Sequence, residues 1–185
     1  ENVALYTDVE WTPTDALLLG AALRWEDYDS FGSTTNWKLS ARYDFTENFA
    51  LRATASTGFR APTPGQANVV NTTTASVSDG MGGQMLVDQG TIAPTTAMLI
   101  NSDAEILQPE ESENLSVGIV ANFGDLDMTL DVYSIDVTGR IALTDTVPVS
   151  AADRQILIAN GVPGAEGLAE YRFFANDFDT ETRGL

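Results

Sequence analysis

Histidine and cysteine are absent from this chain of 185 residues, and basic residues are scarce. Without Cys there are no disulfides, thiolate metal sites or thiol nucleophiles, and without His there is no Ser-His-Asp triad. Nine Lys and Arg stand against 27 Asp and Glu, so the formal charge is −18 and the pI is near 4.1. Nucleic-acid binding needs clustered cations to neutralise phosphates, so no nucleic-acid partner is expected. The acidity favours soluble exposed loops, with cationic ligands as the alternative.

Long apolar runs are also missing. The longest, Ala16 to Leu23, is interrupted by Gly20 and falls far below the roughly eighteen residues of a transmembrane helix. Strands of a membrane barrel need only about ten residues each and show alternation instead, so a membrane location stays open. No signal peptide is evident. The chain starts inside a strand-like pattern and stops at Leu185 without an evident terminus, so we expect it to be part of a longer protein.

Alternation of apolar and polar residues is the dominant pattern. It is clearest where Trp37, Leu39, Ala41, Tyr43 and Phe45 alternate with Lys38, Ser40, Arg42 and Asp44. Period-two patterns predict strands whose two faces meet different surroundings. We expect strands at about residues 2–11, 16–28, 37–45, 49–60, 113–123, 126–133 and 171–178, with an eighth beginning after a turn at Asp179–Glu181. The sequence therefore predicts an all-β, antiparallel protein.

The connections between these strands alternate in length. Those at Thr12, Thr46 and Gly124 are tight, and Gly124–Asp125 has the form of a two-residue hairpin turn. Two are long, at about residues 61–109 and 139–170, and within the second Ser150–Ile158 is predicted to be a short helix capped by Ser150. Short turns at one end and long loops at the other are typical of outer-membrane barrels, whose long loops are external.

Aromatic residues support the same interpretation. The apolar face carries Trp11, Phe45, Phe49 and Phe123 at the ends with short turns, and Trp25 and Trp37 at the other ends. Two aromatic rings at the two membrane interfaces are typical of transmembrane barrels. A soluble β-sandwich with one buried face is the alternative, because it also alternates, but it requires neither aromatic strand ends nor loops sorted by length.

Four stretches resemble the barrel of TonB-dependent outer-membrane receptors, and they occur in the family's order. They are Ser56–Gln66 (STGFRAPTPGQ), Asn36–Asp44, Leu107–Gly118 (LQPEESENLSVG) and Asp131–Ile141. The motif positions that we carry over are Gly58, Phe59, Arg60, Ala61, Pro62, Pro109 and Glu110. The resemblance implies that residues 1–185 are part of one antiparallel transmembrane β-barrel, a partial barrel without the N-terminal plug of the family.

Candidate chemistry is limited to charged clusters. The acidic residues Asp103, Glu105, Glu110, Glu111 and Glu113 suggest either a calcium or cationic-ligand site or, as we favour in the absence of calcium-loop spacing, a solvated loop. On the polar faces Arg24, Lys38, Arg42 and Arg52 either contact a plug or ligand or, as we favour, form ion pairs with Glu26, Asp44 and Asp131 across strands. We expect no enzyme activity, catalytic residue, metal site or cofactor.

The resemblance implies a receptor of the outer membrane of a Gram-negative-type bacterium. Such a receptor takes up a scarce nutrient, such as siderophore-bound iron, cobalamin or a carbohydrate, and is energised by TonB through a plug that is not in this chain. Its implied partners are outer-membrane lipid, TonB and the small-molecule ligand. The alternatives are a passive porin-like barrel and a soluble β-sandwich binding module. The substrate-binding residues stay unassigned.

Overall fold

The computed structural model describes residues 2–78 and 80–185 and divides them into two compact units. Unit 1 comprises residues 1–60, 109–139 and 179–185, and unit 2 comprises residues 61–108 and 140–178. The chain therefore passes from unit 1 into unit 2 twice, once after the fourth strand and once within the long strand that follows the hairpin turn at Gly124.

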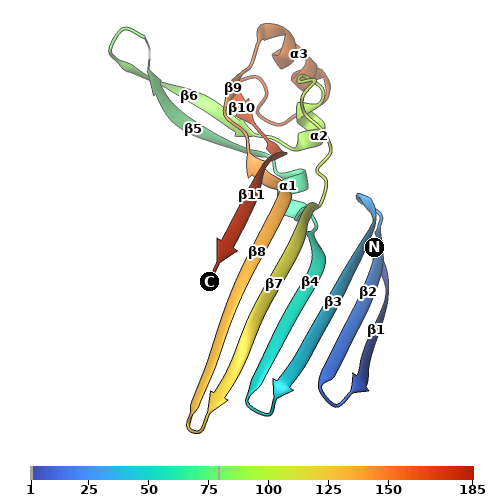
Figure 1. Cartoon of the computed structure of the whole chain (residues 1–185). Helices are drawn as coiled ribbons and strands as arrows, with labels where there is room; N and C mark the ends of the chain where they lie inside the picture. The colour runs from blue at the N-terminus through green and yellow to red at the C-terminus, as the bar shows by residue number, and fades with distance from the viewer. Residues whose placement is uncertain (1, 79) are drawn as a thin grey trace. The chain divides into compact units, whose positions relative to one another are not determined.

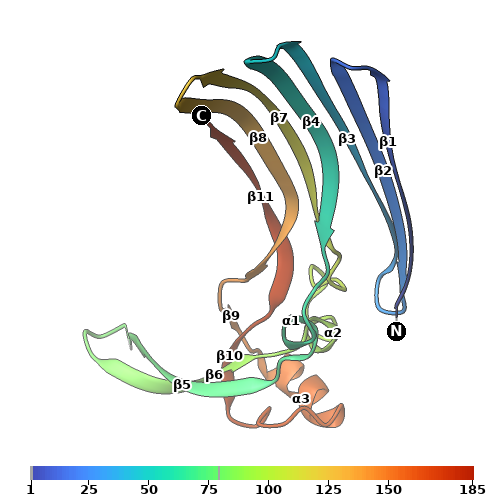
Figure 2. The same cartoon turned by 90° about the horizontal axis from the view of Figure 1, so that it is seen from below.

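Unit 1 is built on one antiparallel sheet (Figures 1 and 2). Its strands are β1 (Asn2–Thr14), β2 (Leu17–Tyr28), β3 (Gly32–Thr46), β4 (Phe49–Arg60), β7 (Glu110–Phe123), β8 (Leu126–Leu143) and β11 (Phe174–Gly184), in that order across the sheet. Within the described residues β1 and β11 are its two edges, so the sheet is not closed. The predicted all-β antiparallel barrel segment is confirmed, including the hairpin turn at Gly124, whose φ is +65°.

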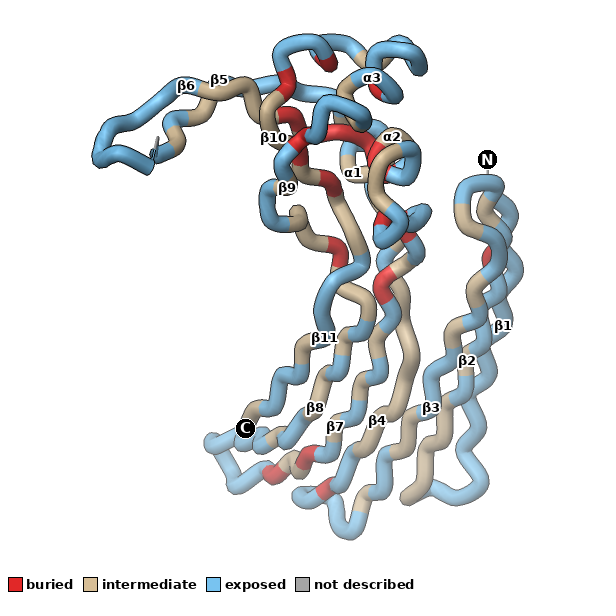
Figure 3. The backbone as a smooth tube through the Cα atoms, turned by 90° about the horizontal axis from the view of Figure 1, so that it is seen from above, coloured by how far each residue is buried: buried red, intermediate tan, exposed pale blue. Residues whose placement is uncertain are grey.

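Unit 2 has the hydrophobic core. Its elements are α1 (Pro64–Asn68), β5 (Asn71–Ser78), β6 (Gln84–Thr91), α2 (Pro94–Ala97), β9 (Val147–Pro148), α3 (Ala151–Ala159) and β10 (Leu168–Arg172). Ile92, Leu157, Leu168 and Phe173 are buried in one cluster. Figure 3 shows buried segments gathered near α2, α3 and β10. The sheet order is β5-β6-β10-β9, and β6 and β10 are parallel. Segments about eighty residues apart in the sequence therefore share one sheet.

The helix predicted near Ser150 is confirmed as α3. Ser150 caps it, since its hydroxyl accepts from the Asp153 amide at 3.1 Å while the Asp153 carboxylate accepts from the Ser150 amide at 3.2 Å. This reciprocal pair is a capping box, which satisfies two donors at the helix start. No helix among residues 2–78 and 80–185 is long and apolar enough to cross a membrane.

Two expectations about the strands were wrong. There is no turn at Asp179–Glu181, because β11 runs without a break from Phe174 to Gly184. The polar residues there suggested a turn, but the sheet uses them: the Asp179 carboxylate accepts from the Gly139 amide at 2.8 Å. The stretch 61–109 also has more structure than its composition indicated, since the Thr-rich β5 pairs with β6 at eight positions.

Candidate functional site

The outward apolar face of unit 1 is a surface without a core beneath it. Among the described residues the only buried hydrophobic side chains of unit 1 are Ala50 and Ala121, and all the others belong to unit 2. Large side chains of the apolar face are instead exposed, with Leu39 at 54% and Leu130 at 51%. A contiguous exposed apolar surface of this kind usually contacts another protein, a ligand or a membrane. A second layer that would make a sandwich is absent from the described part of unit 1.

This apolar face runs obliquely across the sheet. Directly paired residues form a row across the sheet that starts at Trp11 on β1 and reaches Val117 on β7. The residues between them in this row are Leu19, Ala41 and Ala53. The aromatic end of β7, Phe123, lies six residues further on. The apolar band thus shifts by six residues over four strand-to-strand steps. At about 3.3 Å per residue and about 4.8 Å between strands, a band level with a membrane requires a strand tilt of about 45°.

The opposite edge of the band shifts in the same direction. Trp25 on β2 pairs with Thr35, whereas the first aromatic of β3, Trp37, lies two residues further along. Tilts of roughly 35–45° are those of transmembrane barrels. The aromatic positions expected at the two strand ends therefore form two edges that are level only if the strands are tilted. A soluble layer gives no reason for such a shift.

The polar face carries the ion pairs. The arginines expected on this face do pair with the expected carboxylates: Arg24 with Glu26 at 2.7 Å, Arg42 with Asp44 at 2.9 Å, and Arg52 with Asp131. Their geometry is only partly as expected, because the first two pairs join neighbours two residues apart on one strand. These share a face, since side chains of a strand alternate. The third pair joins β4 to β8 across the intervening strand β7.

Gly118 makes the long Arg52–Asp131 pair possible. Arg52 on β4 is opposite Gly118 on β7, which is opposite Asp131 on β8. The Arg52 Nε atom donates to Asp131 Oδ1 at 2.9 Å across the glycine. A Cβ at Gly118 would overlap the Asp131 carboxylate and lie 2.9 Å from the Leu130 carbonyl oxygen. The sequence signal was a glycine amid apolar and polar alternation, which often marks a close approach.

The motif residues meet where β4 and β7 end their pairing. Arg60, the last residue of β4, is opposite Glu110, the first of β7, and its guanidinium donates to Glu110 Oε1. Glu110 is 4% exposed. Pro109 directly precedes Glu110 in the sequence, and Ala61 and Pro62 directly follow Arg60. The segment 61–109 starts at the end of β4 and leads into the start of β7, and the ion pair joins these two strand ends. The sequence did not predict this role for Arg60.

Phe59 and Gly58 have separate contacts next to this ion pair. The Phe59 ring lies 5.8 Å from Tyr28 and 6.4 Å from Phe31, so it joins β4 to the β2–β3 connection. Gly58 lies close to Ser112, whose hydroxyl would be 2.9 Å from an added Cβ. Sequence reasoning did not find this aromatic cluster, because no local pattern links its members across separate strands.

Near the aromatic cluster β3 and β4 separate. Their pairing ends at Lys38 and Ser56, and the Trp37 amide donates to Thr57 Oγ1 at 3.0 Å. A cleft of about 420 Å³ lies there, and the carboxylates that line it are Glu111, Glu113 and Asp136. No group of three or more carboxylates in residues 2–78 and 80–185 has an arrangement suited to a metal ion. The predicted acidic cluster is also divided, since Asp103 and Glu105 belong to unit 2.

Among the described residues of unit 2, one titratable group has a shifted pKa. Burial raises the pKa of the Tyr171 hydroxyl, a hydrogen bond with Asn101 lowers it in part, and Asp153 adds to the increase. Tyr171 is 2% exposed and stacks on Phe173 with ring centroids 6.3 Å apart. This is a structural role in the core, and we assign it no chemistry.

Comparisons with known proteins agree with this geometry. The family of TonB dependent receptor-like β-barrels matches residues 1–185. A curated relative, the vitamin B12 transporter BtuB of Photobacterium profundum, is 35% identical over 63 residues, which are 34% of this chain and 10% of that protein.

Solved structures share the fold. The siderophore receptor PirA from Pseudomonas aeruginosa superposes with a TM-score of 0.69 at 18% identity, over 99% of this chain and 30% of that chain. A variant of the ferric enterobactin receptor PfeA from the same organism, in complex with enterobactin, gives a TM-score of 0.71 at 20% identity, over 99% of this chain and 23% of that chain. The chain thus spans less than a third of each of these three proteins.

Proposed function

The chain belongs to the TonB-dependent receptor family, as part of its β-barrel, and from this premise we propose that it forms wall and external loops of an outer-membrane receptor for a scarce small-molecule nutrient. Unit 1 is a section of the wall, with its apolar face toward lipid and its ion-paired face toward the lumen. The long segments 61–109 and 139–170 lie on the external side and contribute to ligand capture. The observation that carries the membrane assignment is the oblique apolar band.

Transport in this proposal depends on energy from outside the chain. TonB acts through a plug that these residues do not include, while the wall and loops contribute the passage and part of the binding surface. In this proposal the chain's role is binding and passage, and it includes no catalytic step. The class of nutrient is siderophore-bound iron, cobalamin or a carbohydrate.

The scarcity of basic residues in unit 2 indicates which parts of a ligand it contacts. The segment 61–109 contains no Lys, Arg or His. The unit 2 arginines Arg154 and Arg172 are engaged in its fold: Arg154 donates to the Leu168 carbonyl at 2.9 Å and Arg172 to Thr91 Oγ1 at 3.2 Å. Strongly anionic ligands are bound by clustered cations, which this unit does not offer. We therefore expect it to contact neutral portions of a ligand through its Thr, Asn and Gln side chains.

Uptake by whole cells tests the proposal. The full-length receptor is expressed in a Gram-negative host that lacks its own uptake systems, and entry of labelled cobalamin, iron–siderophore complexes and oligosaccharides is measured with and without TonB. We expect saturable uptake of one ligand that is lost without TonB. Uptake that persists without TonB favours the passive porin-like barrel, and recovery of the protein in the soluble fraction without detergent favours the soluble binding module.

A further inference from the structure

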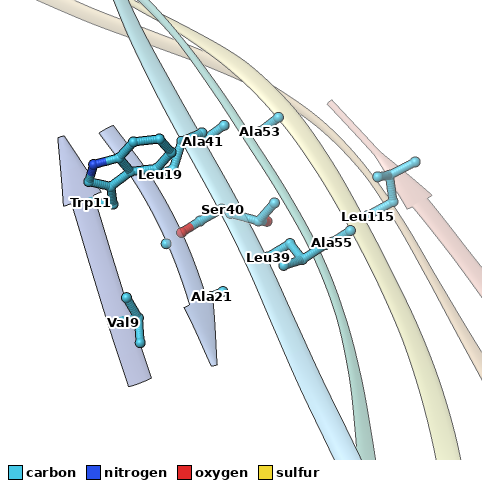
Figure 4. Close-up of a pocket in the computed structure, with 12 residues that line it drawn as sticks. Val9, Trp11, Leu19, Ala21, Leu39, Ser40, Ala41, Ala53, Ala55 and Leu115 are labelled. Carbon is cyan, nitrogen blue, oxygen red and sulfur yellow. The ribbon is translucent and has the colours of Figure 1, made fainter. Parts of the chain in front are cut away.

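The apolar face of unit 1 contains a groove of about 530 Å³. Seven of its lining residues are small, namely Gly20, Ala21, Ser40, Ala41, Ala53, Thr54 and Ala55, and the others are larger apolar residues such as Trp11 and Leu115. Figure 4 shows Trp11 at one end and Leu115 at the other, with the alanines between them. The groove is thus a depression in a surface that is otherwise covered by large apolar side chains.

Strand register produces this depression. Ala41 on β3 and Ala53 on β4 are directly paired, and Ala55 is opposite Leu39 in the neighbouring row. Ala21 on β2 is opposite the same Leu39. Four alanines from three strands therefore lie close together on the apolar face. Elsewhere on this face, many of the corresponding positions are occupied by larger residues such as Leu or Phe. Since close packing requires such a space to be filled, an apolar occupant gains contacts that flat surface does not offer.

The position of the groove identifies the occupant. It lies inside the apolar band and is continuous with the surface that the proposed function places against lipid. Its Trp11 end belongs to the edge of the band on the side of the short turns. Tryptophan at such an edge sits at the membrane interface, where its indole N–H faces headgroups. The chain that enters the groove therefore comes from a lipid of the leaflet on the short-turn side.

The charge of that side selects the headgroup. The three short turns each expose one carboxylate, from Asp15, Glu47 and Asp125, and none of them contains Lys or Arg. A lipid with a cationic amine is attracted to such an edge, and a lipid with net negative charge is repelled. We propose that the groove binds a fatty acyl chain of a zwitterionic, amine-bearing phospholipid, an inference that rests on the proposed membrane orientation.

Fluorescence quenching of Trp11 tests this site. The full-length receptor, with its other tryptophans replaced by Phe, is reconstituted in bilayers that contain either an ethanolamine phospholipid or a glycerol phospholipid with brominated chains. Bromine quenches indole only on contact. The groove is filled by the double change Ala41→Phe and Ala53→Phe, and Leu130→Phe is the matched control on the same apolar face outside the groove.

The expected result is stronger quenching by the brominated ethanolamine lipid than by the glycerol lipid, loss of that difference in the filled variant, and no change in the Leu130→Phe control. Equal quenching by both lipids, or quenching that groove filling leaves unchanged, would overturn the proposal. A receptor that retains Trp25 or Trp37 in place of Trp11 reports insertion separately. If neither of these is quenched by any brominated lipid, the membrane orientation itself fails.

Discussion

At the scale of single residues, a few side chains hold the strands of unit 1 in contact without forming a core. Arg52 reaches Asp131 only because Gly118 leaves room between them. A similar close approach occurs at Gly184, where an added Cβ would overlap the Tyr133 ring. In such a sheet, glycines and charges fix neighbouring strands in place, whereas buried Leu and Ile side chains do so in unit 2.

Gly118→Ala is expected to destabilise the sheet by about 1–3 kcal/mol, the usual cost of forcing a group into filled space. The new methyl group displaces the Asp131 carboxylate and separates it from Arg52. Urea unfolding of the receptor in bilayers measures the change. In the Asp131→Ala background the part of the cost that comes from the carboxylate should vanish, while the part from the Leu130 carbonyl oxygen remains. An equal cost in both backgrounds would show that the glycine does not act through the ion pair.

Arg60→Met is expected to cost about 1–3 kcal/mol, because it leaves the buried Glu110 carboxylate without its guanidinium. The cost is moderated by the Arg60 side chain, which is 58% exposed. Adding Glu110→Gln to Arg60→Met should recover part of the loss, since the neutral amide is cheaper to bury. Unfolding of the single and double variants provides the measurement, and a double variant that is less stable than Arg60→Met would contradict this account.

At the scale of elements, unit 2 is a folded body and not two independent loops. Its parallel β6–β10 pair joins segments that lie on either side of β7 and most of β8 in the sequence. Within the second segment the Phe173 amide donates to Thr144 Oγ1 at 3.1 Å. The core cluster takes residues from both segments, so neither segment has a complete core without the other.

Tyr171 gives unit 2 a dependence on alkaline pH. Its pKa is raised above the usual value of 10.0 in the folded state, so the unfolded chain ionises first. The contribution to stability is then full below pH 10 and is lost as the pH rises through the raised pKa. Calorimetry across this range should show a falling melting temperature for unit 2. Tyr171→Phe should remove that fall at a cost of about 0.5–1.5 kcal/mol at neutral pH, since the hydrogen bond with Asn101 is lost.

The control for this pH effect is Tyr43→Phe in unit 1, which should leave the alkaline transition of unit 2 unchanged. An alkaline transition that persists in Tyr171→Phe would place its origin elsewhere in the unit.

At the scale of the whole molecule, the two faces of unit 1 must meet different surroundings. Leu39 lies on the outward apolar face, and its neighbour Lys38 lies on the polar face. Leu39→Arg should cost about 2–4 kcal/mol in bilayer refolding if it lies near the membrane midplane. Lys38→Leu on the other face should cost much less. Equal costs for the two substitutions would invalidate the assignment of the faces.

The sequence predicted the strands of unit 1 better than those of unit 2. Strand alternation such as Trp37–Phe45 marked unit 1 well, because each strand there has one apolar face and one polar face along much of its length. In unit 2, β5 is rich in Thr, so its composition predicted a loop, and its partner β6 is only partly apolar. Such strands gain their stability from neighbours that are distant in the sequence, and a local pattern does not contain that information.

The sequence by itself determined the all-β class, the division of each strand of unit 1 into an apolar and a polar face, the hairpin turn at Gly124, the Ser150 cap and the charged residues that form the ion pairs. Each of these follows from chemistry within a few residues, or from charges on one face. Only the tertiary structure decided that Arg52 reaches Asp131 over Gly118, that Arg60 closes on Glu110, and that four alanines of β2, β3 and β4 form one groove. These features depend on strand register, which is set by pairing between strands and is not specified by any one strand alone.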